Sequence, residues 1–181
     1  MLKKILIGLG VILLIVLGYV AYALLTTKKH SPQDIVEITQ EDLSVKVVYC
    51  QPYKKGRVIF GDESTGALIP NGKYWRLGAN DATEITFSTD VNFAGEAVSA
   101  GSYRMYAVPN TDSWEVSLNS ALGEWGAFEP DYSLDVIKVN VPAMTTPQET
   151  EQLTIRFGSD STGVQMNMMW DKTLVEVPIA Q

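Results

Sequence analysis

The chain has 181 residues, enough for one domain plus an extension, and a formal charge of −7 at pH 7. Residues 31–181 contain all 21 acidic residues and 10 of the 14 basic ones, so this part carries a formal charge of −11. An acidic surface of this kind repels phosphate backbones, which argues against nucleic acid as a partner. The single cysteine, Cys50, excludes an intrachain disulfide.

Residues 5–25 are uncharged and lie between two pairs of lysines, at positions 3–4 and 28–29. At about 1.5 Å per residue, a helix of this length spans about 30 Å, which matches the hydrocarbon core of a bilayer. The segment predicts a single-pass membrane helix in the cell membrane. The flanking lysines are matched two against two and do not decide its orientation, but the free amino terminus favours a cytoplasmic start, with the following domain outside the cytoplasm, in the periplasm.

A cleaved export signal is the alternative, because Ala21-Tyr22-Ala23 has the small-x-small pattern of a cleavage site. The length of the apolar run favours an uncleaved anchor. The predicted division is an anchor or signal with its linker at residues 1–30, followed by one folded domain at residues 31–181.

Apolar residues alternate with polar ones through most of the second part, and turn residues separate the runs. The pattern predicts eight to ten short strands and no helix after residue 30, which is typical of an all-β, antiparallel β-sandwich of the jelly-roll kind. Residues 120–133 break the alternation and predict a long loop. The expected strands cover residues 35–39, 43–49, 58–60, 83–88, 102–108, 114–118, 137–141, 153–157, 164–170 and 173–179, with a hairpin-like pair around 94–101.

The only histidine, His30, precedes the predicted domain. Ser-His-Asp and Cys-His catalysis and histidine-rich zinc sites are therefore excluded from the domain. Phosphate-binding and dinucleotide-binding loops are also missing from the sequence, and we expect no metal or cofactor.

Carboxylate chemistry is left open by the pair Asp131 and Asp135, with Glu129 nearby, in and just after the predicted long loop. These residues can bind calcium or act as an acid and base pair, but their spacing matches no calcium loop. We favour a solvated acidic loop.

Five of the ten basic residues of the domain fall within 23 positions, at Lys54, Lys55, Arg57, Lys73 and Arg76. Such a cluster can accept a carboxylate or a phosphate, with arginine as a bidentate partner. The alternative is that these side chains form ion pairs, for example Arg76 with Glu84 or Asp90.

The basic cluster ends in the stretch 75–90, where a turn rich in polar residues leads into a well-patterned strand. Thr83, Ile85 and Phe87 fall on one face of that strand. Asn80 is either a turn-capping residue or part of a site.

Three of the four tryptophans, Trp75, Trp114 and Trp170, lie on strand-like apolar runs and are expected in the core. Trp125 lies between Gly123 and Gly126 and is the best candidate for an exposed stacking aromatic.

The motifs K-K-G-R-x-I-F-G (54–61), P-N-G-K-Y-W-R-L-G-A-N-D-A-T-E-I-T-F-S (70–88), A-G-S-Y (100–103) and W-E-V-S-L-N (114–119) resemble a bacterial family known as domain of unknown function 2911. The resemblance covers nearly all of residues 31–181 and implies a β-rich exported or membrane-tethered domain of a Gram-negative bacterium. It implies no activity. The residues that match the family signature are Lys55, Gly56, Arg57, Trp75, Arg76, Gly78, Asn80 and Thr83.

The sequence favours a non-enzymatic, membrane-anchored binding or interaction module of the cell envelope, attached through residues 5–25. Its partner is a small anionic ligand or an envelope protein. A carboxylate-dependent enzyme acting on carbohydrate or another envelope substrate is the alternative, and a structural envelope protein is a third. The candidate ligand-binding residues are Lys55, Arg57, Trp75, Arg76, Asn80 and Trp125.

Overall fold

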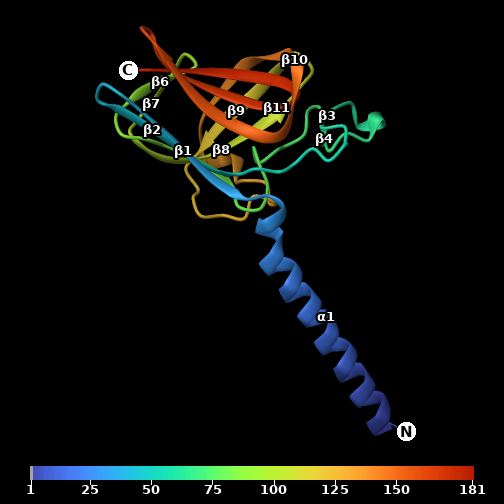
Figure 1. Cartoon of the computed structure of the whole chain (residues 1–181). Helices are drawn as coiled ribbons and strands as arrows, with labels where there is room; N and C mark the ends of the chain where they lie inside the picture. The colour runs from blue at the N-terminus through green and yellow to red at the C-terminus, as the bar shows by residue number, and fades with distance from the viewer. Residues whose placement is uncertain (1) are drawn as a thin grey trace.

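Figure 1 shows the computed structural model of the protein, in which one long helix projects from a β-rich domain. The structure describes residues 2–181, except for the side chains of residues 2, 3, 5, 23–25 and 28. Helix α1 spans Leu2–His30, and short 3-10 turns lie at Glu63–Thr65 and Tyr132–Leu134. The strands are β1 (Gln33–Gln40), β2 (Leu43–Cys50), β3 (Phe60–Gly61), β4 (Ile69–Pro70), β5 (Thr83–Phe87), β6 (Val91–Phe93), β7 (Glu96–Val98), β8 (Gly101–Pro109), β9 (Ser113–Asn119), β10 (Asp135–Asp160) and β11 (Gly163–Ala180).

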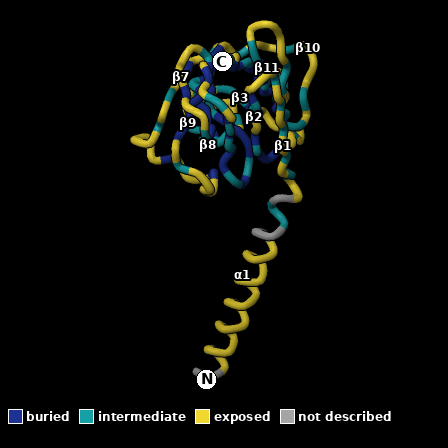
Figure 2. Tube along the Cα trace, turned by 90° about the vertical axis from the view of Figure 1, so that its left-hand side faces the viewer, coloured by how far each residue is buried: buried dark blue, intermediate teal, exposed yellow. Residues whose placement is uncertain are grey.

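Helix α1 is exposed at the described positions from residue 4 to residue 22, while Thr26 and Thr27, near the domain, are half-buried (Figure 2). Within the part of the chain that the structure describes, no helix is long and apolar enough to cross a membrane. The predicted span 5–25 and the predicted cleavage after Ala23 fall partly outside the described residues, so both stay predictions.

Nine strands form one antiparallel sheet in the order β1-β2-β5-β8-β9-β10-β11-β6-β7. The short strands β3 and β4 pair separately and in parallel. The sheet folds back on itself, so that β10 and β11 pass in front of β8 and β9 (Figure 1). Phe87 of β5 therefore meets Phe93 of β6 across the core, with ring centroids 6.0 Å apart, although several strands separate them in the sheet. The predicted antiparallel β-rich domain after one N-terminal helix is confirmed.

Alternation along the strands determines which side chains fill the core. Thr83, Ile85 and Phe87 of β5 are all buried, as predicted. Trp75, Trp114 and Trp170 are buried together, and the rings of Trp75 and Trp170 stack with centroids 5.9 Å apart. Stacked and edge-on aromatic pairs add to the burial of apolar area, so these rings form a rigid part of the core.

The second half of the domain differs from the predicted run of short strands. Residues 137–141 and 153–157 belong to one strand, β10, and residues 164–170 and 173–179 belong to one strand, β11. Shifts in register at Thr145, Thr150 and Thr154 bend β10 without ending its pairing with β11, and Asp171 bends β11 through a φ of 54°. Bulges of this kind interrupt apolar alternation, which is why one bent strand resembles two.

Two smaller expectations also differ. Strand β1 is longer than residues 35–39, and Val58 is 50% exposed although residues 58–60 were expected to be a buried run. Val58 lies in the irregular segment before β3, where no partner strand covers it.

The turn before β5 packs closely against β2, and Gly78 makes this approach possible. A Cβ atom at Gly78 would lie 2.8 Å from the carbonyl oxygen of Cys50. We expect Gly78→Ala to lower the free energy of unfolding by about 1–3 kcal/mol, because backbone must move to relieve the overlap. Gly158→Ala is the matched control, since the nearest atom to its Cβ would be 4.0 Å away.

Urea unfolding of the full chain in mild detergent, followed by tryptophan fluorescence, measures both variants. Equal midpoints for the two variants would mean that the turn is free to move away from β2.

Candidate functional site

The segment 74–76 pairs with the outer end of β8 before the chain turns into β5. The backbone of Trp75 exchanges two hydrogen bonds with Ala107, at 2.8 and 2.9 Å. Because successive side chains of an extended segment point to opposite sides, Trp75 enters the core while Tyr74 and Arg76 face the other way. Leu77 and Asn80 then adopt left-handed conformations, with φ of 53° and 59°, and these reverse the chain.

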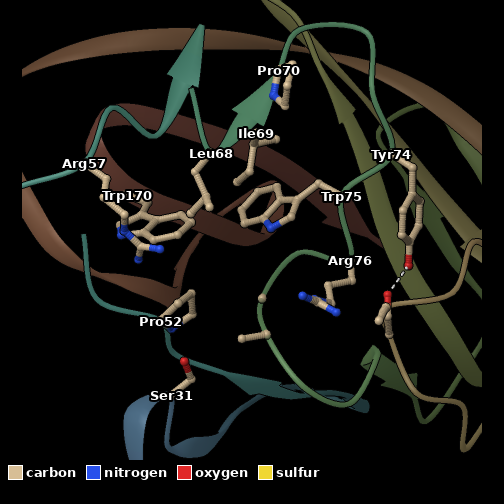
Figure 3. A pocket seen from close by; sticks show the side chains of 14 residues that line it. Ser31, Pro52, Arg57, Leu68, Ile69, Pro70, Tyr74, Trp75, Arg76 and Trp170 are labelled. Carbon is tan, nitrogen blue, oxygen red and sulfur yellow. Dashed lines mark hydrogen bonds between the residues drawn. The ribbon is translucent and has the colours of Figure 1, made fainter. Parts of the chain in front are cut away.

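A cavity of about 380 Å³ opens beside this segment (Figure 3). We call it the arginine pocket. One side is apolar and aromatic, and the guanidinium of Arg76 extends into the opening from the opposite side. Its size falls within the range of small-molecule sites. The residues that line it are Ser31, Pro52, Arg57, Leu68, Ile69, Pro70, Tyr74, Trp75, Arg76, Gly78, Ala79, Gly126, Ala127 and Trp170.

Arg76 is half-buried, and its side chain makes no hydrogen bond or ion pair with any residue that the structure describes. The carboxylates suggested as its partners are engaged elsewhere. Glu84 accepts a hydrogen bond from the backbone N–H of Gly123, and Asp90 accepts one from Ala100, both at 2.8 Å. The alternative in which Arg76 forms a structural ion pair with either residue is therefore wrong.

Arg57 lies at the edge of the same pocket and is exposed. Its Nε donates to the carbonyl of Lys54 at 2.9 Å, and one terminal nitrogen donates to the carbonyl of Tyr53. No Asp or Glu of the described chain lines the arginine pocket. Two guanidinium groups without an acidic neighbour in the wall make this opening a positive site in an acidic domain.

The other predicted site residues lie outside the arginine pocket. Lys55 is exposed and lines a neighbouring cavity. Asn80 is buried in a left-handed conformation, and its amide donates to the carbonyl of Ser31 at 3.3 Å, which ties the turn to the start of the domain instead of capping the turn itself. Trp125 is 37% exposed, as expected, but its backbone bridges to Asp81 instead of lining the cavity. Ligand contacts of Lys55, Asn80 and Trp125 stay predictions.

Arg104 of β8 holds the loop that forms one wall of the arginine pocket, although it was not among the predicted site residues. Its guanidinium is fully buried, forms an ion pair with Glu124, and donates to the carbonyl of Phe128 at 2.7 Å and to the hydroxyl of Tyr74 at 2.6 Å. Tyr74 in turn donates to the carbonyl of Gly126 at 3.0 Å. These contacts fix the loop that carries Gly126 and Ala127 into the pocket wall.

Burial raises the pKa of the Tyr74 hydroxyl, and the neighbouring Arg104 opposes this effect only partly. Tyr74 therefore keeps its proton near neutral pH and acts as a donor to Gly126. The signal that the sequence offers for this network is Arg104 itself, a single charged residue within the predicted strand 102–108.

The acidic residues of the loop do not converge on the arginine pocket. Asp135 accepts hydrogen bonds from Tyr106 and Asn119, Asp131 accepts from Ser133, and Glu129 accepts from the hydroxyl of Tyr132. A separate depression of about 220 Å³ is lined in part by Asp81, Glu84 and Glu124. Within the described residues, no group of acidic, cysteine or histidine side chains has an arrangement that would hold a metal ion.

Removing the carboxylate of Glu124 leaves the buried Arg104 without its counter-charge. Breaking a buried ion pair in this way costs about 3–5 kcal/mol, and we expect Glu124→Ala to fall near the lower limit, because the Glu124 side chain is 47% exposed. Urea unfolding of the full chain measures the loss, and limited proteolysis within residues 120–131 measures opening of the loop. Glu96→Ala, at an exposed position, is the control and should change stability by less than about 0.5 kcal/mol. If both variants unfold at the same urea concentration, Tyr74 and the Phe128 carbonyl suffice to hold Arg104.

Residues 31–179 match the protein family described as "Protein of unknown function (DUF2911)". No curated protein and no solved structure matches the chain. The matched range contains the sheet except for Ala180, the last residue of β11, and every lining residue of the arginine pocket. The resemblance found in the W-R-x-G-A-N-x-A-T motif is thereby confirmed, and the chain belongs to the DUF2911 family.

Proposed function

We propose that the protein is a membrane-anchored binding module of the cell envelope that accepts a small anionic ligand in the arginine pocket. The observation that carries the proposal is the side chain of Arg76. It is half-buried, faces the cavity, and has no protein partner within the described residues.

A guanidinium withdrawn from water gains stability from a planar anion that accepts two of its N–H groups. In most folded proteins such a group is paired with a carboxylate of the same chain. Here the two carboxylates considered as partners, Glu84 and Asp90, accept hydrogen bonds elsewhere, and no described carboxylate pairs with Arg76, so its donors are available to a ligand. Arg57 at the pocket edge adds a second positive charge.

The apolar wall suits an uncharged portion of the same ligand. Leu68, Ile69, Trp75 and Trp170 line one side of the cavity. Sites for small molecules combine such apolar walls with a few polar groups that orient the ligand. The ligand class that fits this arrangement has one carboxylate or phosphate and a short apolar body.

Membrane attachment is supported by the sequence of residues 5–25 and by the exposure of the helix. Leu14 is 70% exposed and Ile15 is 66% exposed, and the helix projects away from the domain (Figure 2). Burying a side chain of this type gains about 1.5–3 kcal/mol, and a bilayer is an apolar medium of matching thickness. We infer that the domain is held at the periplasmic surface of the membrane.

A carboxylate-dependent enzyme is supported less well. That chemistry needs two carboxyl groups about 5–10 Å apart around the substrate. The wall of the arginine pocket contains neither Asp nor Glu among the described residues. Asp131 caps an exposed turn by accepting the backbone N–H of Ser133, and Asp135 accepts a hydrogen bond from Asn119.

Thermal unfolding of the full chain in phosphatidylcholine nanodiscs tests the proposal, with hexanoate as the anionic probe and hexanol as its neutral counterpart. At about 100 times its Kd, a ligand stabilises the folded state by about 2.7 kcal/mol. This raises the Tm by about 5–10 °C in a domain of this size. We expect hexanoate to produce the larger shift.

Arg76→Gln should weaken hexanoate binding by about 10- to 100-fold, because hydrogen bonds to a charged group are worth about 1.5–3 kcal/mol. Arg156→Gln is the matched control, since Arg156 is exposed on β10 and does not line the arginine pocket. The proposal fails if hexanoate shifts the Tm of the wild type and the Arg76→Gln variant equally, or if it shifts neither.

A further inference from the structure

The arginine pocket continues into a second cavity at the base of helix α1. This junction pocket has a volume of about 300 Å³ and is lined by His30, Ser31, Pro52, Tyr53, Lys55 and Arg57. Three of these residues, Ser31, Pro52 and Arg57, also line the arginine pocket. Because Ser31 directly follows the last residue of α1, both cavities open at the end of the domain from which the helix projects.

The position of Ser31 relates this opening to the membrane surface. Ser31 lies six positions after Leu25, the last residue of the predicted span 5–25, which corresponds to about 9 Å of helix. The headgroup layer on each side of a bilayer is about 5–8 Å thick. If residues 5–25 span the membrane, the rim of both cavities stands at the outer edge of the headgroups.

The charged side chains that line the two cavities are basic, in contrast to the domain as a whole. Lys55, Arg57 and Arg76 line the cavities, while residues 31–181 together carry a formal charge of −11. Lys29 precedes the junction pocket in the last turn of α1. Glu151 also lies here, because its carboxylate accepts the backbone N–H of Lys55 at 2.9 Å. Anionic lipids attract basic residues next to a membrane segment. The charge at the base of the helix therefore complements an anionic membrane surface.

Exposed apolar residues border the same opening. Gly126 and Ala127 form part of the pocket wall, and the residues on either side of them, Trp125 and Phe128, are 37% and 72% exposed. The loop that carries them lies beside the base of α1 (Figure 1). Aromatic side chains next to basic ones are typical of protein surfaces in contact with the headgroup region.

We propose that the ligand of the arginine pocket is the phosphate headgroup of an anionic membrane lipid, which enters through the junction pocket. This inference rests on the proposed function. The phosphate binds between Arg57 and Arg76, and the glycerol and upper chain carbons contact Leu68 and Trp170. The cavity is small for a complete lipid, so the acyl chains remain in the bilayer.

The test uses the full chain in nanodiscs that contain phosphatidylglycerol with a photoreactive diazirine on its headgroup. Trp170 is the residue to examine, because it lines the pocket but is 1% exposed, so a lipid at the outer surface does not reach it. We expect mass spectrometry to find labelled Trp170, with at least about tenfold less label in Arg76→Gln and an unchanged amount in Arg156→Gln. Phosphatidylcholine carrying the same diazirine should label Trp170 weakly.

Addition of hexyl phosphate, a soluble phosphate with one short chain, separates the two sources of the anion. Competition by hexyl phosphate for labelling of Trp170 supports the inference. If hexanoate and hexyl phosphate raise the Tm but phosphatidylglycerol does not label Trp170, the site takes a soluble anion. The inference is then overturned and the proposed function stands. If neither soluble probe shifts the Tm and no label appears, both are overturned.

Discussion

The buried guanidinium of Arg104 is the interaction on which the candidate site depends. A cation withdrawn from water is tolerated only when counter-charge and acceptors surround it, and Arg104 obtains these from Glu124, Phe128 and Tyr74. Glu124 and Phe128 belong to the loop, whereas Tyr74 belongs to the segment beside β8. The sheet face and the loop must therefore close together, and this closure builds the wall of the arginine pocket.

Arg104 and Arg76 both carry a positive charge that is partly or fully withdrawn from water, and the domain accommodates the two charges in opposite ways. Arg104 lies in the middle of the sheet, and the chain folds a loop over it to compensate its charge. Arg76 lies at a sheet margin, where the side-chain alternation that sends Trp75 into the core directs Arg76 toward an opening. The nearby carboxylates are engaged with backbone N–H groups at Gly123 and Ala100. In the proposed function, the charge of Arg76 is left for a group from outside the chain.

The alternation of apolar residues predicts β2 and β5 well, because each is a straight strand with one face in the core. It fails in β10 and β11, where bulges and the left-handed Asp171 change which face is buried without ending the strand. The basic cluster identifies Arg57 and Arg76 from sequence alone. The roles of Tyr74 and Arg104 depend on contacts between residues 20 to 52 positions apart, and local patterns carry no information about such contacts.

In the proposed arrangement, the charge distribution orients the domain on the membrane. Interactions between exposed charges are screened within about 8–10 Å at physiological salt, so an anionic bilayer acts mainly on the groups next to helix α1. Most of those groups are basic, at Lys29, Lys55 and Arg57, with Glu151 beside Lys55, while the excess of acidic residues belongs to the rest of the domain. The anionic bilayer attracts the basic groups at the base of the domain and repels the acidic surface elsewhere. Both effects favour an orientation in which the two pockets face the bilayer. The acidic composition that argues against nucleic acid therefore also favours the orientation that a lipid-binding pocket requires.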